Sequence, residues 1–170
     1  MSYLLPEDVK SYNRDGEPVE MPKIKVLLAD DHAMIREGTR RILEESGSIE
    51  VVGEASDGAE AIRQAIALHP DVVLMDIAMP KLDGVKATQE IKEKLPSVAV
   101  LILSAYDDDA YLFPVLKAGA AGYLLKNCRG SELVDAVKAV IRGESVLHPI
   151  VAAKVLRSLS HNLDEKKDDE

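Results

Sequence analysis

Four stretches of the chain consist of an apolar run followed at once by a polar residue that could take part in chemistry. The runs are 26–29, 72–75, 98–103 and 123–125, and the residues that follow them are Asp30 with Asp31, Asp76, Ser104 and Lys126. Continuous aliphatic runs of this kind are typical of parallel strands that are buried on both faces. In an open α/β sheet, the functional site lies just beyond the carboxyl ends of the strands. We therefore expect three carboxylates, one hydroxyl and one ammonium group to meet at one edge of a sheet.

The carboxylates of this set predict a site for a divalent cation. Clustered carboxylates repel one another, so three at one edge are costly unless a cation neutralises them. Their hard oxygen atoms favour Mg²⁺, which is usually held by one or two carboxylates and by phosphate oxygens. We expect Asp31 and Asp76 to bind the ion, with Asp30 acting directly or through water. The backbone carbonyl of Ala78 is expected to supply a further ligand.

The same residues could carry out phosphoryl transfer. Asp76 is the central carboxylate and can act as the nucleophile, which would make it an acyl phosphate. Lys126 would pair with one phosphoryl oxygen, and the hydroxyl of Ser104 would donate to another. Phosphorylation of Asp76 would add negative charge and draw Ser104 inward, which gives this local event a way to move a neighbouring helix.

Two functions of different classes would use this chemistry. One is a phosphorylation switch, and the other is a Mg²⁺-dependent phosphohydrolase that turns over small phosphate esters with Asp76 as its nucleophile. Such a hydrolase normally needs another acid two residues after the nucleophile, because the leaving group must be protonated. Ala78 occupies that position. We therefore favour a switch over a turnover enzyme.

Alternating strand and helix signals from Lys23 onward predict the scaffold that positions these residues. Strands are expected over 26–29, 49–55, 72–75, 98–104 and 122–125. Helices are expected over 32–46 and 57–69, from the loop at 80–84 to about 95, over 107–117, and around 133–141. Five strand–helix units in a row imply a parallel sheet with helices on both faces, joined by right-handed crossovers.

The apolar positions in these helices predict which face each helix buries. The inward residues are expected to be Ile35, Gly38, Thr39 and Ile42 in the first helix and Ile62, Ala65 and Ile66 in the second. The helix near 133–141 has a buried stripe of Leu133, Ala136, Val137, Val140 and Ile141. Pro114 lies inside the helix at 107–117 and should kink or weaken it.

The two ends of the chain differ from this central part. Residues 1–22 contain three prolines, scattered charges and no periodicity, so we expect a flexible extension. Residues 149–163 predict a sixth helix with one apolar side, within a segment 146–163 that we interpret as a linker or interaction helix. Residues 164–170 form an acidic tail.

Composition narrows the classes of partner and compartment. The chain has 170 residues, a size that fits one compact domain, and its single Cys128 suits a reducing compartment. No apolar run is long enough to span a membrane and no signal peptide is evident, so we expect a cytoplasmic protein. The net charge is −9, and without a basic excess we expect no direct binding to nucleic acid. None of the four histidines has ligand spacing, so we assign none to a metal.

The motifs around these residues resemble the receiver domain of two-component response regulators. They are 29–32 (ADDH), 71–84 (DVVLMDIAMPKLDG), 103–105 (LSA) and 119–126 (GAAGYLLK), which occur in the family's order and spacing within residues 23–145. The resemblance implies a flavodoxin-like (CheY-like) sheet of five parallel strands in the order 2-1-3-4-5. It also implies Mg²⁺-dependent transfer of a phosphoryl group to Asp76 from a sensor histidine kinase or a phosphotransfer protein, followed by slow self-dephosphorylation. Tyr123 occupies the family's aromatic switch position.

Within this family, the chain resembles the NarL/FixJ (LuxR-type) subfamily. The likeness rests on Gly122–Lys126 followed by Asn127 where many receivers have proline, and on Gly143–Pro149 before an amphipathic helix. In that subfamily the helix leads to a helix-turn-helix domain that controls transcription, and receivers often form homodimers on phosphorylation. This sequence ends at Glu170 without such a domain. We favour a fragment of a transcription regulator over a protein that acts without DNA.

Overall fold

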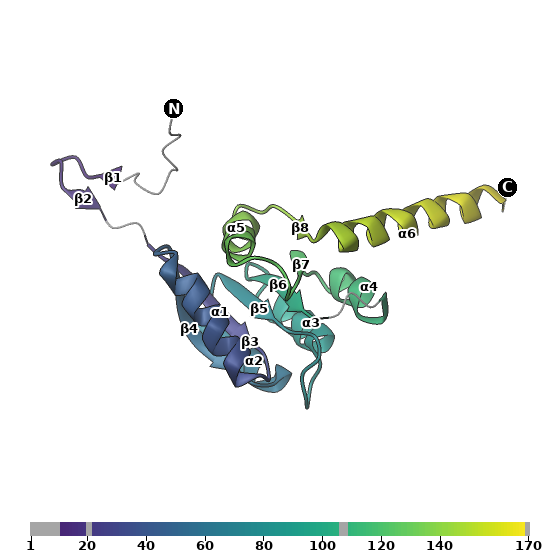
Figure 1. The fold of residues 1–170 in the computed structure, drawn as a ribbon, viewed down its shortest axis with the longest axis horizontal. Helices are drawn as coiled ribbons and strands as arrows, with labels where there is room; N and C mark the ends of the chain where they lie inside the picture. The colour runs from purple at the N-terminus through teal and green to yellow at the C-terminus, as the bar shows by residue number, and fades with distance from the viewer. Residues whose placement is uncertain (1–10, 20–21, 106–108, 169–170) are drawn as a thin grey trace.

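The computed structural model describes residues 11–19, 22–105 and 109–168. Its central element is a six-stranded parallel sheet in the order β4-β3-β5-β6-β7-β8 (Figure 1). These strands are β3 (Ile24–Ala29), β4 (Ile49–Ala55), β5 (Val72–Met75), β6 (Ala99–Ser104), β7 (Gly122–Leu125) and β8 (Val146–Leu147). The helices are α1 (Ala33–Glu45), α2 (Gly58–Leu68), α3 (Gly84–Lys94), α4 (Asp109–Lys117), α5 (Gly130–Ile141) and α6 (Pro149–Asp168). The first five of these strands confirm the predicted flavodoxin-like order 2-1-3-4-5.

Helices cover both faces of the sheet, and strand alternation explains why β5 and most of β3 and β6 are apolar. Along β3, Val26 and Leu28 face a core formed with α1 and α5, whereas Leu27 and Ala29 face a core formed with α2, α3 and α4. Successive strand residues point to opposite faces, so a strand covered on both sides needs an apolar residue at every position. The continuous apolar runs of the sequence follow from this arrangement.

The register of the sheet brings the strand ends to one edge. Ala29 of β3 pairs with Met75 of β5, and Ser104 of β6 pairs with Leu125 of β7. Each of these pairs lies at the carboxyl ends of its two strands, and the polar residues of the sequence follow directly. The predicted convergence at the carboxyl edge is therefore a property of the fold.

The sixth strand is a feature that the sequence analysis did not predict. Its two residues, Val146 and Leu147, fall in the segment that we interpreted as a linker or interaction helix, and they pair in parallel with Gly122 and Tyr123. A Cβ atom at position 122 would collide with the carbonyl oxygen of Val146, so the glycine permits this close approach. The five-stranded sheet of the prediction is thus extended by a sixth strand.

Several predicted inward residues lie at the margins of the helix interfaces instead. Ile35 and Ile42 of α1, Ile66 of α2 and Ile141 of α5 are each about 41–42% exposed. Leu43 is the buried residue of α1. A helix in an outer layer buries only a narrow stripe, so residues at the edge of that stripe stay half exposed.

The segments before β3 and after β8 contain more secondary structure than the sequence predicts. Residues 11–19 form a hairpin of β1 (Ser11–Tyr12) and β2 (Pro18–Val19), within the extension that we expected to be flexible. Helix α6 continues to Asp168 instead of ending at residue 163. Figure 1 shows the hairpin and α6 projecting from the central domain at opposite sides. Helix α4 contains Pro114 as predicted, and the first two residues predicted for it, 107 and 108, lie outside the described residues.

None of the helices in the described part of the chain is both long and apolar enough to cross a membrane.

Candidate functional site

Asp76 is the most deeply buried carboxylate at the carboxyl edge of the sheet. It follows β5 directly, is 4% exposed, and its N–H donates to the carbonyl of Ala29 at 2.8 Å. Burial raises the pKa of Asp76 above its ordinary value; the ammonium of Lys126 opposes this effect, and the negative charge of Asp30 adds to it. Burial and the neighbouring Asp30 therefore disfavour the charged form of this carboxylate, and Lys126 offsets part of that effect.

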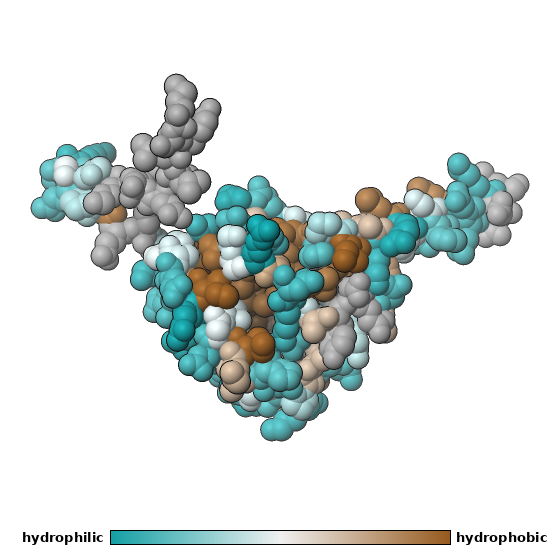
Figure 2. Space-filling view, viewed as in Figure 1, coloured by the Kyte–Doolittle hydropathy of each residue, from teal (hydrophilic) through white to brown (hydrophobic). Residues whose placement is uncertain are grey.

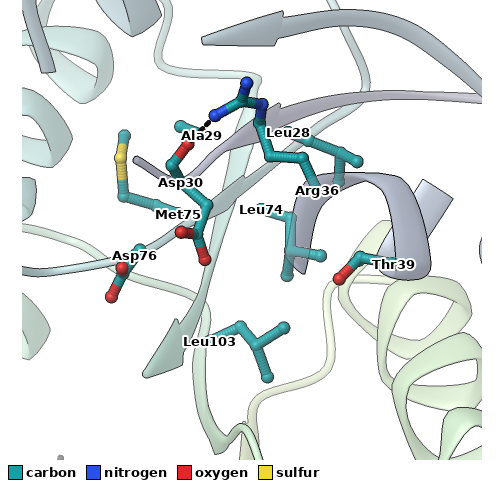
Figure 3. Close-up of a pocket in the computed structure, with 9 residues that line it drawn as sticks. All are labelled: Leu28, Ala29, Asp30, Arg36, Thr39, Leu74, Met75, Asp76 and Leu103. Atoms are coloured by element: carbon teal, nitrogen blue, oxygen red, sulfur yellow. Dashed lines mark hydrogen bonds between the residues drawn. The ribbon is translucent and has the colours of Figure 1, made fainter. Parts of the chain in front are cut away.

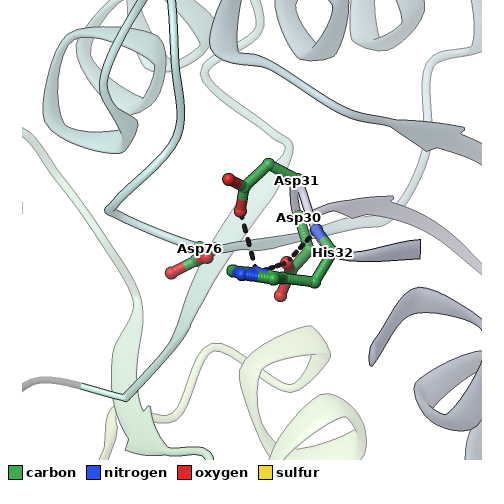
Figure 4. A group of neighbouring side chains, drawn as sticks. All are labelled: Asp30, Asp31, His32 and Asp76. Atoms are coloured by element: carbon green, nitrogen blue, oxygen red, sulfur yellow. Dashed lines mark hydrogen bonds and ion pairs between the residues drawn. The ribbon is translucent and has the colours of Figure 1, made fainter. Parts of the chain in front are cut away.

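Three carboxylates and one imidazole meet at this edge. Figure 4 shows Asp30, Asp31, His32 and Asp76 together, and one potential ligand atom from each lies within 4.8 Å of the others. Nδ1 of His32 lies 3.2 Å from Oδ1 of Asp30 and 3.0 Å from Oδ1 of Asp31. The predicted meeting of the three acids is thus present in the structure.

His32 is a member of this cluster that the sequence analysis did not identify. The four histidines have no ligand spacing among themselves, whereas the relevant signal is that His32 follows Asp30 and Asp31 directly. Its N–H donates to Oδ1 of Asp30 at 2.8 Å, and this turn brings the imidazole back over the two carboxylates. The imidazole therefore belongs among the groups that could contact a cation here.

Lys126 supplies the positive charge nearest to the buried acids. Its Nζ lies 2.7 Å from Oδ2 of Asp30 and 3.2 Å from Oδ2 of Asp76. Burial disfavours the charged form, but the hydrogen bond to Asp30 and the charge of Asp76 outweigh burial, so the pKa of Lys126 is raised. The lysine therefore stays charged and bridges the ends of β3 and β5 from its position after β7.

Ser104 and Tyr123, the predicted switch residues, are both fully buried near this edge. Ser104 ends β6, and its carbonyl accepts a hydrogen bond from the N–H of Lys126 at 2.8 Å. Tyr123 of β7 lies in the same core cluster as Leu112 and Val115 of α4. Ser104 and Tyr123 therefore lie on the adjacent strands β6 and β7. Ser104 ends its strand at the acidic edge, and Tyr123 packs in the core that α4 covers.

The loop after β5 holds Ala78 and Gly84. The N–H of Ala78 lies 3.4 Å from Oδ1 of Asp76 and donates to it. Gly84 begins α3 so close to the strand end that a Cβ atom there would lie 2.5 Å from the carbonyl oxygen of Asp76. A glycine is therefore required where α3 starts against the end of β5.

A small pocket of about 10 Å³ lies beside Asp30, on its α1 side (Figure 3). It is lined by Leu28, Ala29, Asp30, Arg36, Thr39, Leu74, Met75, Asp76 and Leu103. Arg36 reaches into this region from α1, and its guanidinium contacts the backbone of Asp30. The backbone of Asp30 is thus contacted by Arg36 from the α1 side, and its carboxylate is contacted by Lys126.

The donor set fits a hard divalent cation. Carboxylate oxygens from two adjacent strands are close enough to share one ion, and the buried negative charge of Asp30 and Asp76 exceeds that of the single Lys126. Mg²⁺ prefers oxygen ligands of this kind and retains several waters. The chemistry of the residues present therefore agrees with the predicted cofactor.

The fold and this acidic edge together define a doubly wound α/β protein of the CheY-like class. The family model of the response regulator receiver domain matches residues 26–138. The chain therefore belongs to the response regulator receiver family, in which an acidic cluster of this kind is typical of the Mg²⁺ site.

Individual relatives place the chain beside regulators of the NarL/LuxR type. It is 46% identical over 139 residues to the transcriptional regulatory protein LiaR of Bacillus subtilis. The matched region covers 82% of this chain and 66% of LiaR. The receiver of a NarL response regulator from Mycobacterium tuberculosis superimposes with a TM-score of 0.70 at 41% identity, covering 73% of this chain and all of the other. A LuxR-family response regulator from Aurantimonas gives 0.76 at 33% identity, over 81% and 99%.

The match to full-length regulators is partial. The chain spans about 62–66% of the length of the curated relatives that it matches.

Proposed function

We propose that this receiver accepts a phosphoryl group on Asp76 from a sensor histidine kinase or a phosphotransfer protein, in a Mg²⁺-dependent reaction, and thereby switches an interaction surface. The observation that carries the proposal is the position of Asp76. It is a buried carboxylate, 3.2 Å from the ammonium of Lys126 and within the acidic cluster. This arrangement is what a phosphoacceptor requires: one nucleophile with positive charge beside it.

The residues would divide the work as follows. An oxygen of Asp76 attacks phosphorus as the bond to the donor nitrogen breaks, and the leaving imidazole takes up a proton. Lys126 neutralises charge on one phosphoryl oxygen and the hydroxyl of Ser104 donates to another. Asp31 and Asp76 would hold Mg²⁺, with Asp30 bound directly or through water and the carbonyl of Ala78 as a further ligand. The ion, when bound, supplies positive charge to the phosphoryl oxygens.

The proposed output is a conformational switch. Ser104 would move toward the new phosphoryl group, and Tyr123 on the adjacent strand would respond to the space that this movement leaves. Tyr123 is buried with residues of α4, and its carbonyl accepts a hydrogen bond from the N–H of His148, which directly precedes α6. The segment 146–163 is therefore well placed to transmit the change to a partner or to a second copy of the chain.

The compartment, assembly and output of this switch are proposed from its membership of the receiver family. We propose a cytoplasmic regulator whose receiver forms homodimers on phosphorylation and controls transcription through a DNA-binding domain outside this chain. The phosphohydrolase alternative is disfavoured, because the position two residues after Asp76 carries the methyl group of Ala78 where such an enzyme needs an acid.

The direct test is intact-mass analysis after incubation with Mg²⁺ and acetyl phosphate. We expect the mass to increase by one phosphoryl group, and we expect Asp76→Ala to abolish the increase. A size measurement on the same samples would show whether the labelled protein dimerises. An unaltered chain that gains no mass would rule the phosphoacceptor function out, and steady release of phosphate from small esters would support the hydrolase instead.

A further inference from the structure

Arg36 contacts, from the α1 side, the backbone of the two neighbouring acids Asp30 and Asp31, here called the acid pair. Its Nη1 donates to the carbonyl oxygen of Asp30 at 2.6 Å (Figure 3). That carbonyl belongs to the peptide group that joins Asp30 to Asp31, and a peptide group is planar. Holding the carbonyl therefore restricts the orientation of this peptide, and the side chains of Asp30 and Asp31 leave the chain on either side of it.

A second nitrogen of the guanidinium lies at ion-pair distance from Glu54 on the neighbouring strand β4. Nε of Arg36 lies 3.3 Å from Oε1 of Glu54, an ion-pair distance, although the alignment does not form a hydrogen bond. In the described part of the chain, this Nε is the one buried side-chain nitrogen or oxygen without a hydrogen-bond partner. The guanidinium has thus been placed for its contact with Asp30 at the expense of its own hydrogen bonding.

Glu54 has a second arginine partner that does not reach the acids. Its Oε2 accepts from Nη1 of Arg40 at 2.9 Å, and Arg40 also pairs with Glu44 at 3.0 Å. The side chain of Arg40 is 43% exposed, whereas that of Arg36 is 19% exposed. The two arginines share one carboxylate but differ in burial and in contact with Asp30, so Arg40 serves as a matched control.

We propose that Arg36 is a positioning residue for the cation site: it sets the direction of the Asp30–Asp31 peptide, and Glu54 holds it in place. Lysine would keep the positive charge but not the planar fork that contacts a carbonyl and a carboxylate at once. The Lys variant therefore separates positioning from charge. This inference rests on the proposed function only in assuming that the acid pair binds Mg²⁺.

The test measures Mg²⁺ binding directly. Titration of the full chain with MgCl₂ would be followed by the NMR amide signals of Asp31 and His32, which report both the affinity and the folded state. Loss of a group that orients a metal ligand typically weakens binding by at least about tenfold. We expect a loss of this size for Arg36→Met, a several-fold loss for Arg36→Lys and for Glu54→Gln, and a change below about twofold for Arg40→Met.

Specific outcomes would overturn the proposal. One is wild-type Mg²⁺ affinity in Arg36→Met or, if that variant does not fold, in Glu54→Gln. Full affinity in Arg36→Lys would show that only the charge matters, and an equal loss in Arg40→Met would show that the contact with Asp30 is not decisive. Failure of the unaltered chain to bind Mg²⁺ would overturn it outright. Mg²⁺ binding without labelling of Asp76 would refute the proposed function and leave this inference standing.

Discussion

The carboxyl edge of the central sheet and the outer part of α6 place their residues in opposite environments. At the edge, charged and polar groups are buried: Asp30 is 7% exposed, Asp76 is 4% exposed and Ser104 is fully buried. Along α6, apolar groups are exposed, with Leu156, Leu159 and Leu163 between 55% and 65% accessible. Figure 2 shows such hydrophobic residues among hydrophilic ones on the projecting helix. One region carries the cost of buried charge, and the other carries the cost of exposed apolar surface.

The difference lies in how strongly each region is coupled to the rest of the chain. At the edge, Lys126 contacts two carboxylates from two other strands at 2.7 and 3.2 Å, and such contacts are strong where water is excluded. On α6, Val151 near the N-terminus is fully buried in the core, and Lys154 pairs with Asp109 of α4 at 3.1 Å. We therefore expect changes at the edge to affect chemistry, and changes on α6 to affect stability only near its start.

The largest expected effect is on the rate of phosphoryl labelling. Lys126→Met removes the ammonium beside Asp76, and loss of one such group typically slows the chemical step by about 100-fold. The matched control is Lys154→Met, which removes an ammonium of the same type from α6. Rates of labelling by acetyl phosphate at saturating Mg²⁺ would be compared by intact mass. Equal labelling rates in the two variants would show that the ammonium beside Asp76 does not speed the chemical step.

The next effect distinguishes the buried start of α6 from its exposed end. Val151→Ala should destabilise the chain by about 2 kcal/mol, because it removes two buried methyl groups and leaves a cavity. Leu163→Ala removes a larger but 64% exposed side chain, and it should change the free energy of unfolding by no more than about 0.5 kcal/mol. Urea unfolding of both variants gives the comparison. A larger loss for Leu163→Ala would mean that the outer helix is covered in solution.

The same contrast explains which features the sequence could predict. The bounds of β4 (49–55) and β7 (122–125) match the prediction, and the three acids meet at the edge as expected. Runs that are apolar at every position, as in β5, are typical of parallel strands covered on both faces, so this signal is local and strong. Strand β4, which contains Glu50 and Glu54, shows it only in part. Because strand order then places the strand ends together, the acidic edge followed from local patterns alone.

Features that depend on contacts between distant residues were not predictable in this way. Strand β8 has only two residues and depends on the absence of a side chain at Gly122, far away in the sequence. The contact of Arg36 with the carbonyl of Asp30 involves backbone direction, which residue types do not reveal. Ile42 is 41% exposed although it lies against the start of α5, where a Cβ atom on Gly130 would lie 2.9 Å from its side chain.

The smallest effect tests the cost of buried charge at the edge. Burial raises the pKa of Asp76 in the folded chain above its value in the unfolded chain. A carboxyl of this kind stabilises the fold when it is protonated. This contribution is fully present below the unfolded pKa and is lost as the pH rises through the folded pKa. In buffer without divalent cations, the contribution of Asp76 to the free energy of unfolding should therefore increase as the pH falls from neutral.

Asp76→Asn removes this charge and keeps the shape of the side chain, while Lys126 retains its partner Asp30 at 2.7 Å. The variant should therefore be more stable than the unaltered chain by about 1 kcal/mol near pH 8, and the difference should shrink toward pH 4 as Asp76 itself becomes protonated. Thermal or urea unfolding across this range measures it, and Asp164→Asn on the exposed end of α6 is the control. A variant that is less stable at pH 8 would show that Lys126 compensates the buried carboxylate fully. The edge would then carry no stored electrostatic cost for a bound cation to relieve.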